Sequence, residues 1–293
     1  MPSGPLAAAL AYILWGLFPL YIKQLHGVPA LEIVLHRSWW SMVFVFGLLA
    51  VLRRWAWLAP LVRQPRTLAI FGASALLLGC NWLLYVWAVN AGRVLDASLG
   101  YFINPLINVM LGFAVLHERP TRVQWAAVAL AGAGVLWMAV GAGHVPWVSL
   151  VLALSFGLYG LLRKTAPLGA LEGLALETLL LAPLALAGVL WLQFSGQGHL
   201  AQGNTALDLL LLAAGPFTAI PLLLFASGAR RVSMATLGLL QYLGPSIQFV
   251  LGVFVYHEPF SASRAIGFAL IWAALLVYSA ASWRVRSDQI ARQ

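Results

Sequence analysis

Charged residues are scarce in this sequence, and cysteine is almost absent. Asp, Glu, Lys and Arg make up 9% of the 293 residues, against about 25% in an ordinary soluble domain. The lone cysteine, Cys80, excludes a disulfide scaffold, a zinc ribbon and an iron–sulfur cluster. Hydrophobic residues make up 62% of the chain, so a soluble globular protein, a disordered chain and a coiled coil are also excluded.

The hydrophobic residues form blocks of about 20, the length at which a helix crosses a hydrocarbon core about 30 Å thick. They predict an all-α integral membrane protein of ten transmembrane helices, with approximate limits 4–23, 30–52, 67–90, 95–116, 121–141, 146–163, 170–193, 206–228, 232–256 and 262–283. The first block lacks a basic leading segment and a small-residue cleavage site. We therefore interpret it as a retained helix rather than a signal peptide.

The positive charge of the chain predicts its orientation in the membrane. With the N-terminus inside, the inner side carries 13 of the 17 Lys and Arg residues, including Arg163 and Lys164 at the end of the sixth span. Both termini are then cytoplasmic. The formal net charge of +9 is explained without a nucleic-acid surface.

The two halves of the chain resemble each other weakly. Four pairs of landmarks recur in order at offsets of 140 to 144 residues: Trp15-Gly16 with Tyr159-Gly160, Leu31-Glu32 with Leu171-Glu172, Pro105 with Pro245, and His117-Glu118 with His257-Glu258. Each half has five predicted spans, an odd number, so the second copy would be inverted relative to the first. We expect repeats over 4–141 and 146–283, followed by a cytoplasmic tail over 284–293. Inverted repeats of this kind typically place a substrate site at the bilayer midplane.

Pro105 and Pro245 lie within predicted spans at equivalent positions. Proline removes a backbone hydrogen bond, and matching helix breaks in two repeats point to a binding site. The alternative is that the two kinks serve only the shape of the bundle. Polar and aromatic side chains on these and neighbouring spans favour a cavity, whose candidate residues are Trp15, Asn81, Tyr85, Tyr101, Asn104, Asn108, Tyr159, Gln241, Tyr242 and Gln248. For Trp15 and Tyr159, a role in anchoring the helices at the membrane interface is an open alternative.

Four ionisable residues within spans are candidates for charge coupling: Glu32, His36, Arg37 and Glu177. Arg37 and Glu177 are repeat equivalents of opposite charge. Glu177 is the strongest candidate for proton coupling, since it lies roughly 10 Å from the inner face by helix rise. In the alternative reading both charges are neutralised locally, Arg37 by Glu32 and Glu177 by Lys164 or the backbone.

His117-Glu118 and His257-Glu258 close the fourth and ninth spans. They predict a contact that stabilises a helical hairpin, in which the glutamate interacts favourably with the free amides of a nearby helix start. The alternative is that they form a gate. Thr121 and Ser261 are expected to cap the helices that follow. The sequence shows no metal constellation, nucleophile elbow, phosphate loop or pair of catalytic carboxylates, so we expect no metal, no cofactor and no enzyme activity.

These landmarks resemble the drug/metabolite transporter superfamily with paired EamA domains. Residues 11–21 (AYILWGLFPLY), 31–37 (LEIVLHR), 81–90 (NWLLYVWAVN), 100–106 (GYFINPL) and 241–245 (QYLGP) are similar to its RarD branch. The resemblance implies a bacterial inner-membrane protein that exports small metabolites or amino acids by alternating access.

The function expected from this reading is secondary transport of a small organic metabolite, amino acid or drug-like solute, with the lipid bilayer and the solute as partners. Aromatic and amide side chains suit an amphipathic or zwitterionic solute better than a phosphate or a metal ion. Two alternatives are a lipid scramblase and a non-transporting drug-response factor. The solute and the oligomeric state stay open.

Overall fold

The computed structural model describes residues 3–61, 63–90, 94–141, 147–255 and 262–290, and over these residues the chain is helical with no strand. Nine helices in this part of the chain are long and apolar enough to cross a membrane. A tenth, shorter apolar stretch, Ala265–Tyr278, lies within the last helix. The all-helical membrane architecture predicted from hydropathy is confirmed.

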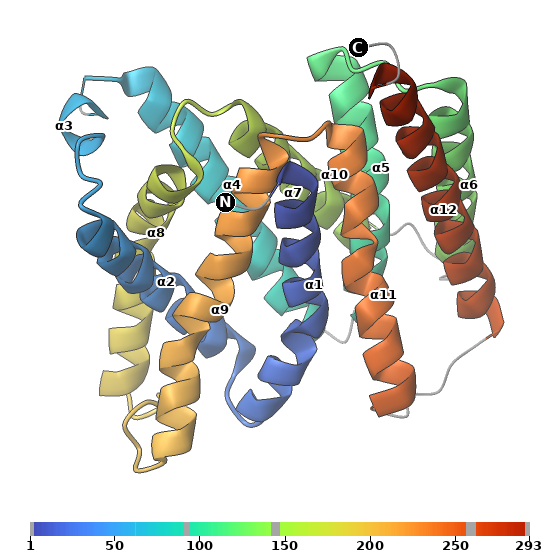
Figure 1. Ribbon diagram of the computed structural model, residues 1–293. Coiled ribbons are helices and arrows are strands. Elements are labelled where there is room, and N and C mark those ends of the chain that lie inside the picture. Colours follow the sequence, from blue (N-terminus) through green and yellow to red (C-terminus); the bar gives the residue numbers. More distant parts are fainter. Residues whose placement is uncertain (1–2, 62, 91–93, 142–146, 256–261, 291–293) are drawn as a thin grey trace.

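The helices follow one another with short connections (Figure 1). The first half contains α1 (Gly4–Ile22), the 3-10 turn η1 (Lys23–Leu25), α2 (Ala30–Leu52), α3 (Leu58–Leu61), α4 (Pro65–Asn90), α5 (Val94–Leu116) and α6 (Arg122–Gly141). The second half contains α7 (Trp147–Thr165), α8 (Ala170–Phe194), α9 (Thr205–Ala229), α10 (Met234–Gln241), α11 (Leu243–Val250), the π-helical turn η2 (Leu251–Val255) and α12 (Ala262–Ile290).

Three features differ from the predicted limits. The ninth span is interrupted at Tyr242, between α10 and α11, whereas α5 runs through Pro105 as one helix. Pro105 therefore lies within a continuous helix, while Pro245 lies three residues after an interruption. Helix α12 continues to Ile290, beyond the predicted end at 283, and the short helix α3 lies in a predicted loop.

Side-chain caps explain several helix starts. Thr121 Oγ1 accepts a hydrogen bond from Gln124 N at 3.3 Å, and Gln124 Oε1 accepts one from Thr121 N at 2.7 Å, a reciprocal capping box before α6. Asn204 and Ser233 cap α9 and α10, because their side chains accept hydrogen bonds from Leu207 N and Thr236 N. The cap predicted at Thr121 is confirmed, while Ser261 lies outside the described residues.

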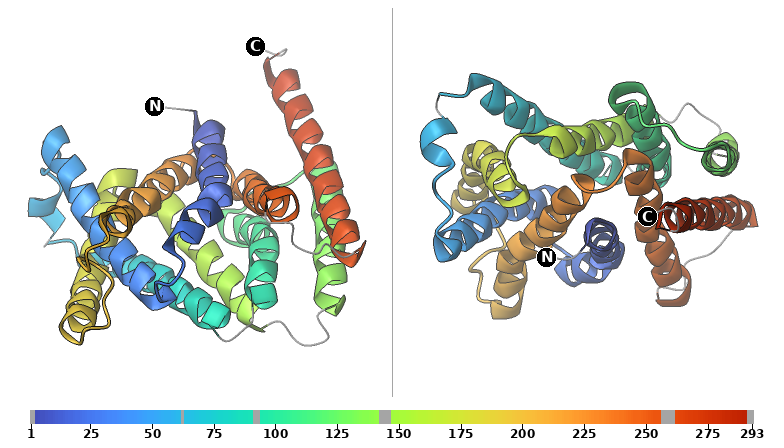
Figure 2. Two further views of the ribbon diagram at one scale, coloured as in Figure 1. Left: turned by 90° about the horizontal axis from the view of Figure 1, so that it is seen from below. Right: turned by 45° about the horizontal axis from the view of Figure 1, so that its top comes forward.

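Helices from the two halves pack against one another throughout the bundle. Helix α2 packs on α8 and α9, α5 on α7 and α10, and α1 on α9 and α11. Helices α6 and α12 pair with each other at one edge (Figures 1 and 2). Helix α10 can approach α5 closely because a Cβ at Gly238 would lie 2.6 Å from the carbonyl oxygen of Pro105.

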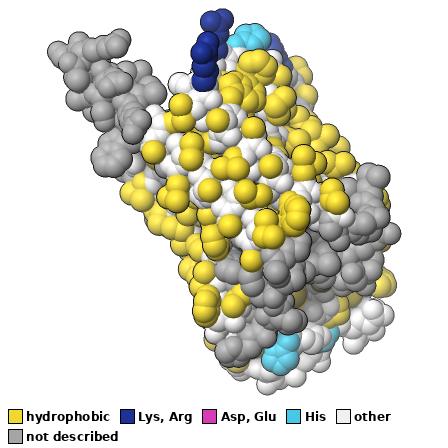
Figure 3. All heavy atoms as spheres, turned by 90° about the vertical axis from the view of Figure 1, so that its right-hand side faces the viewer, with side chains coloured by type: hydrophobic (Ala, Val, Ile, Leu, Met, Phe, Trp, Pro, Cys, Tyr) yellow, Lys and Arg dark blue, Asp and Glu magenta, His cyan; other side chains and the backbone are white. Residues whose placement is uncertain are grey.

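The outer surface of this edge is apolar. Leu136 and Val140 on α6 and Leu276 on α12 are 65%, 79% and 71% exposed. Figure 3 shows apolar side chains over the middle of this face, with Lys and Arg gathered at one end. A surface of this kind is expected to contact lipid.

Candidate functional site

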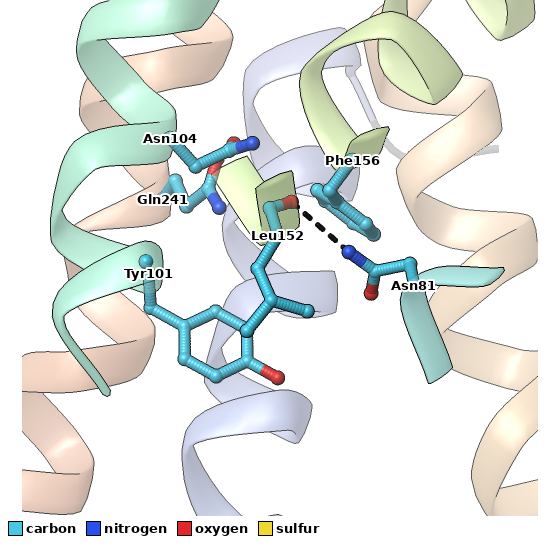
Figure 4. A pocket seen from close by; sticks show the side chains of 7 residues that line it. Asn81, Tyr101, Asn104, Leu152, Phe156 and Gln241 are labelled. Atoms are coloured by element: carbon cyan, nitrogen blue, oxygen red, sulfur yellow. Dashed lines mark hydrogen bonds between the residues drawn. The ribbon is translucent and has the colours of Figure 1, made fainter. Parts of the chain in front are cut away.

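A small pocket lies among α4, α5, α7 and α10. Its lining comprises Asn81, Gly100, Tyr101, Asn104, Leu152, Phe156 and Gln241. Figure 4 shows the side chains of Asn81, Asn104 and Gln241 converging around Leu152 and Phe156. The cavity has a volume of about 10 Å³, which is room for roughly one water molecule.

A chain of amide hydrogen bonds connects the helices around this pocket. Asn108 Nδ2 donates to Asn104 Oδ1 and to Gln241 Oε1, both at 3.1 Å. Asn104 Nδ2 in turn donates to the carbonyl of Ala153 at 2.5 Å. Asn81 Nδ2 donates to the carbonyl of Leu152 at 3.0 Å. The amides therefore join α5 to α10, and α4 and α5 to α7, in a region without bulk water to satisfy them.

The two prolines add backbone acceptors at the same place. A proline inside a helix removes the N–H that would bond to the carbonyl four residues earlier. For Pro105 that carbonyl belongs to Tyr101, and for Pro245 it belongs to Gln241. Both of these residues line the pocket, so each proline deprives the carbonyl of a lining residue of its helical donor, although only the second helix is interrupted.

An aromatic cluster closes one side of the pocket. The Phe156 ring lies 5.7 Å from Trp15, 5.7 Å from Tyr159 and 5.4 Å from Phe225, measured between ring centroids. Tyr159 is fully buried and stacks on Phe225, with centroids 5.9 Å apart. Trp15, which is half-buried, and the fully buried Tyr159 thus pack beside the pocket without lining it.

The structure brings most of the predicted cavity residues together. Asn81, Tyr101, Asn104 and Gln241 line the pocket, Asn108 is hydrogen-bonded to two of them, and the ring of Tyr85 lies 5.9 Å from that of Tyr101. Two predicted residues lie elsewhere. Tyr242 donates its hydroxyl to the carbonyl of Phe102, and the exposed Gln248 donates to the carbonyl of Trp15, which Pro19 deprives of its helical donor.

Three lining residues were not predicted: Gly100, Leu152 and Phe156. Leu152 contributes its carbonyl as an acceptor for Asn81, and a backbone group carries no signal in the sequence. Phe156 lies one helical turn before Tyr159, so helical spacing from that predicted residue could have identified it.

One alternative from the sequence was that Glu32 neutralises Arg37, which lies on α2. The structure does not show this pair. Arg37 Nε donates to Thr218 Oγ1 at 2.9 Å, and its guanidinium lies 4.8 Å from the Phe18 ring centroid and 5.0 Å from that of Trp82. The same guanidinium is within electrostatic range of the hydroxyl groups of Tyr85 and Tyr101. The Arg37 guanidinium is therefore within electrostatic range of the pocket-lining Tyr101.

Glu32 instead holds the α8–α9 loop. Its carboxylate accepts hydrogen bonds from the backbone N of His199 at 2.7 Å and faces His199 Nδ1 at 2.7 Å. His36 Nε2 lies 3.7 Å from the same carboxylate, and Trp40 donates to His36 Nδ1. Glu32 and His36 thus form a structural cluster with a loop residue that the sequence did not single out.

Glu177 on α8 is fully buried, and its partner is Arg163 rather than Lys164. Arg163 Nη1 lies 3.7 Å from Glu177 Oε1, and Ser74 donates a hydrogen bond to the same oxygen. Lys164 points away, to the backbone carbonyls of Ala229 and Val232. Arg163, which was counted with the inner-side charges, is 1% exposed, so its side chain is buried within the protein.

Glu118 acts as a cap on another helix. Its Oε1 accepts from Met234 N at 2.8 Å and its Oε2 from Ala235 N at 3.3 Å, which satisfies free amides at the start of α10. The helix that follows directly, α6, is capped by Thr121. His117 is exposed and adopts a left-handed φ of 54° at the end of α5, while His257 and Glu258 lie outside the described residues.

Over the described residues, no group of three or more His, Cys, Asp or Glu side chains is placed to hold a metal ion. Long apolar helices, an apolar flank and a polar pocket among helices of both halves define a multi-pass membrane protein with a small internal polar site.

Residues 2–140 match the EamA-like transporter family. The chain is 48% identical to the uncharacterized transporter PA0485 of Pseudomonas aeruginosa, over 94% of this chain and 92% of that protein. It is 48% identical to the uncharacterized transporter YojE of Bacillus subtilis, over 94% and 93%. It is 44% identical to the protein RarD of Escherichia coli, over 94% and 93%. The chain therefore belongs to the EamA-like transporter family and to its RarD branch.

The fold is also found in a known structure. A crystal structure of another protein matches with a TM-score of 0.69 at 18% identity, over 94% of this chain and 96% of that chain. At this level of identity the likeness concerns the fold alone.

Proposed function

We propose that this protein is a secondary transporter that moves a small organic solute outward across the bacterial inner membrane by alternating access. The solute binds in the amide pocket, and ten spans form two inverted repeats around it. The pocket's polar atoms recognise hydrogen-bonding groups of the solute, and the aromatic cluster contacts its apolar part.

The observation that carries this proposal is that Tyr101 and Gln241, the residues whose carbonyls lose their helical donors to Pro105 and Pro245, line one pocket. Irregular backbone is tolerated at membrane depth where it is buried in protein or lines a cavity, and helix breaks in the two repeats of a transporter commonly surround the substrate. Here Tyr101 and Gln241, whose carbonyls lack their helical donors, line one pocket with Asn81 and Asn104 between α4, α5, α7 and α10.

The size of the pocket supports a cycle with closed and open states. A cavity of about 10 Å³ is far below the roughly 300–1,000 Å³ of typical ligand sites, so a metabolite enters only after helices separate. Glu118, which binds the start of α10, and the aromatic cluster around Phe225 are the contacts on the predicted inner side that would have to open.

Helix packing supports the inverted repeat. Exchanging the halves replaces α1 by α7, α2 by α8, α4 by α9, and α5 by α10 and α11. The observed contacts keep this pattern: α5 packs on α7 as α1 packs on α10 and α11, α4 packs on α7 as α1 packs on α9, and α2 and α8 pack on each other.

Reconstitution tests the transport function. Purified protein in proteoliposomes is assayed for uptake, efflux and counterflow with a panel of amino acids, aromatic metabolites, organic acids and chloramphenicol. At least one solute should move faster than in empty vesicles. Failure of every solute, with and without a proton gradient, contradicts the proposal.

Single substitutions test the pocket once a solute is known. Asn104→Leu or Gln241→Leu should leave the protein inserted and weaken solute binding roughly 5- to 150-fold, the value of about 1–3 kcal/mol for a lost buried hydrogen bond. Gln124→Leu, at the exposed cap of α6, is the matched amide control. Unchanged kinetics in both pocket variants would assign these amides to packing.

Glu177 is proposed as the proton-coupling group. Glu177→Gln removes titration at this site, so the variant should retain solute counterflow and lose acceleration by a pH gradient. Glu172→Gln, which alters the partly exposed pair with Arg54, is the control. An unchanged pH dependence in Glu177→Gln would leave Glu177 as a structural partner of Arg163.

The orientation is tested by reporters that are active only in the cytoplasm. Fusions after Gln293 or within 56–65 should be active, and fusions within 195–204 should be inactive. A reporter result that places 195–204 and the C-terminus on one side contradicts both the ten-span topology and the inverted repeat.

A further inference from the structure

Arg37 is a cation inside a membrane span, and among the described residues no carboxylate lies within ion-pairing distance of it. The arginines that pair with glutamates in this part of the chain are Arg54 and Arg163, and Glu32, five residues before Arg37, is engaged by His199. Charges at membrane depth are costly and tend to mark substrate or ion pathways. The presence of Arg37 in this span therefore requires a functional explanation in addition to a structural one.

One hydrogen bond and two cation–π contacts hold the guanidinium of Arg37. Nε donates to Thr218 Oγ1 at 2.9 Å, and the rings of Phe18 and Trp82 lie 4.8 and 5.0 Å from Cζ. Such cation–π contacts stabilise the charge and orient the plane of the group. Within the described part of the chain, its terminal nitrogens Nη1 and Nη2 make no hydrogen bond to protein.

The position of Arg37 links it to the amide pocket. The hydroxyl groups of Tyr85 and Tyr101 lie within electrostatic range of the guanidinium, the two tyrosine rings are 5.9 Å apart, and Tyr101 lines the pocket. A solute in the pocket could thus extend past Tyr101 and reach the terminal nitrogens of Arg37.

We infer that Arg37 binds a carboxylate of the transported solute, and that the substrate class is organic monocarboxylates with an apolar or aromatic body. This inference rests on the proposed transport function. The two terminal nitrogens form a planar fork that matches two carboxylate oxygens. One cation balances one negative charge, so a phosphate dianion would keep an uncompensated charge in the membrane. The rings of Phe18, Trp82 and Phe156 supply contacts for the body of the solute.

Matched pairs of probes test the inference by ligand binding to purified full-length protein in detergent. The pairs are phenylacetate with phenylacetamide, indole-3-acetate with indole-3-acetamide, and hexanoate with hexanamide, which differ only in the charged group. The unmodified protein should bind the carboxylate of at least one pair more tightly than its amide. No preference in any pair, or a preference for the amides, overturns the inference.

Arg37→Gln locates the preference. Carboxylate affinity should fall about 10- to 150-fold, as for loss of a hydrogen bond to a charged group, while affinity for the amide probe stays the same. Arg54→Gln removes an arginine from the loop between α2 and α3 and should change neither value. Persistence of the carboxylate preference in Arg37→Gln overturns the inference.

Thr218→Val provides a second test if Arg37→Gln does not fold. It keeps the charge and releases Nε, so carboxylate affinity should fall several-fold and amide affinity should not. An equal loss for both probes would assign the pair to packing and overturn the inference. Transport of neutral or cationic solutes alone would also overturn it while leaving the proposed transport function intact.

Discussion

Arg37 and Glu177 lie 140 residues apart, at positions that the proposed repeat makes equivalent, yet their surroundings differ. Arg37 on α2 is half-buried, bonded to the hydroxyl of Thr218 and without a carboxylate partner in the described structure. Glu177 on α8 is fully buried, bonded to the hydroxyl of Ser74 and paired with Arg163. Both bind a hydroxyl of a neighbouring helix, but one charge is compensated inside the protein and the other is not.

This difference indicates two roles for charges within the spans, one structural and one in solute recognition. The pair around Glu177 joins α4, α7 and α8, and each member depends on the other because an isolated buried charge is strongly destabilising. Arg37 is stabilised by two aromatic rings and is partly exposed. It can therefore carry its charge without a carboxylate partner. We expect stability to depend on the Glu177 region and solute recognition to depend on the Arg37 region.

Arg163→Met should have the largest effect on this comparison. It leaves the Glu177 carboxylate buried without its cation and should lower the free energy of unfolding by roughly 3–5 kcal/mol. Thermal or denaturant unfolding in detergent measures the change. The double variant Arg163→Met/Glu177→Met should recover most of the loss, and a double variant as unstable as the single one would contradict the pairing.

Gly173→Ala should disturb the same region by overpacking. A Cβ at Gly173 would lie 2.6 Å from Phe71 Cε1 and would also collide with Arg163 Nη1. We expect a loss of about 1–3 kcal/mol in unfolding free energy. Gly72→Ala is the matched control on α4, where a Cβ meets nothing within 4 Å, and it should be neutral or stabilising by about 0.5–1 kcal/mol.

Arg37→Gln should have the smallest effect on stability. It removes one hydrogen bond and the cation–π contacts without leaving a charge unpaired, so the expected loss is about 0.5–1.5 kcal/mol. The same unfolding measurement checks it beside Arg163→Met. A loss as large as that of Arg163→Met would show that Arg37 is a structural charge and would remove the contrast between the two regions.

Much of the fold could be predicted from hydropathy, because every helix crossing a membrane must be long and apolar. The predicted limits of the second span coincide with α2, Ala30–Leu52. The interruption at Tyr242 could not be placed, because the proline that signals it lies three residues later and an equivalent proline leaves α5 continuous. The difference between the interrupted ninth span and the continuous α5 coincides with a tertiary contact, the close approach of α10 to α5 at Gly238.

The candidate site was predictable where side chains alone determine it. Asn81, Asn104 and Gln241 were identified because an amide in a span must find partners inside the protein. Arg163 was missed because a charge near the end of a span is counted with the loop, although its long side chain turns inward to Glu177 and the carbonyl of Ala170. Sequence does not record the direction in which such a side chain extends.

The amide network also determines which groups remain available to a solute. The Nδ2 groups of Asn81, Asn104 and Asn108 all donate within the protein, whereas Asn108 Oδ1 is buried without a partner. Together with the carbonyls that Pro105 and Pro245 deprive of their helical donors, the asparagines therefore leave acceptors rather than donors free around the pocket. It would act as a desolvation filter, because a solute group that only accepts loses its hydrogen bonds to water without replacement, at about 1–3 kcal/mol each. Solutes with N–H or O–H groups facing the amides would pass this filter.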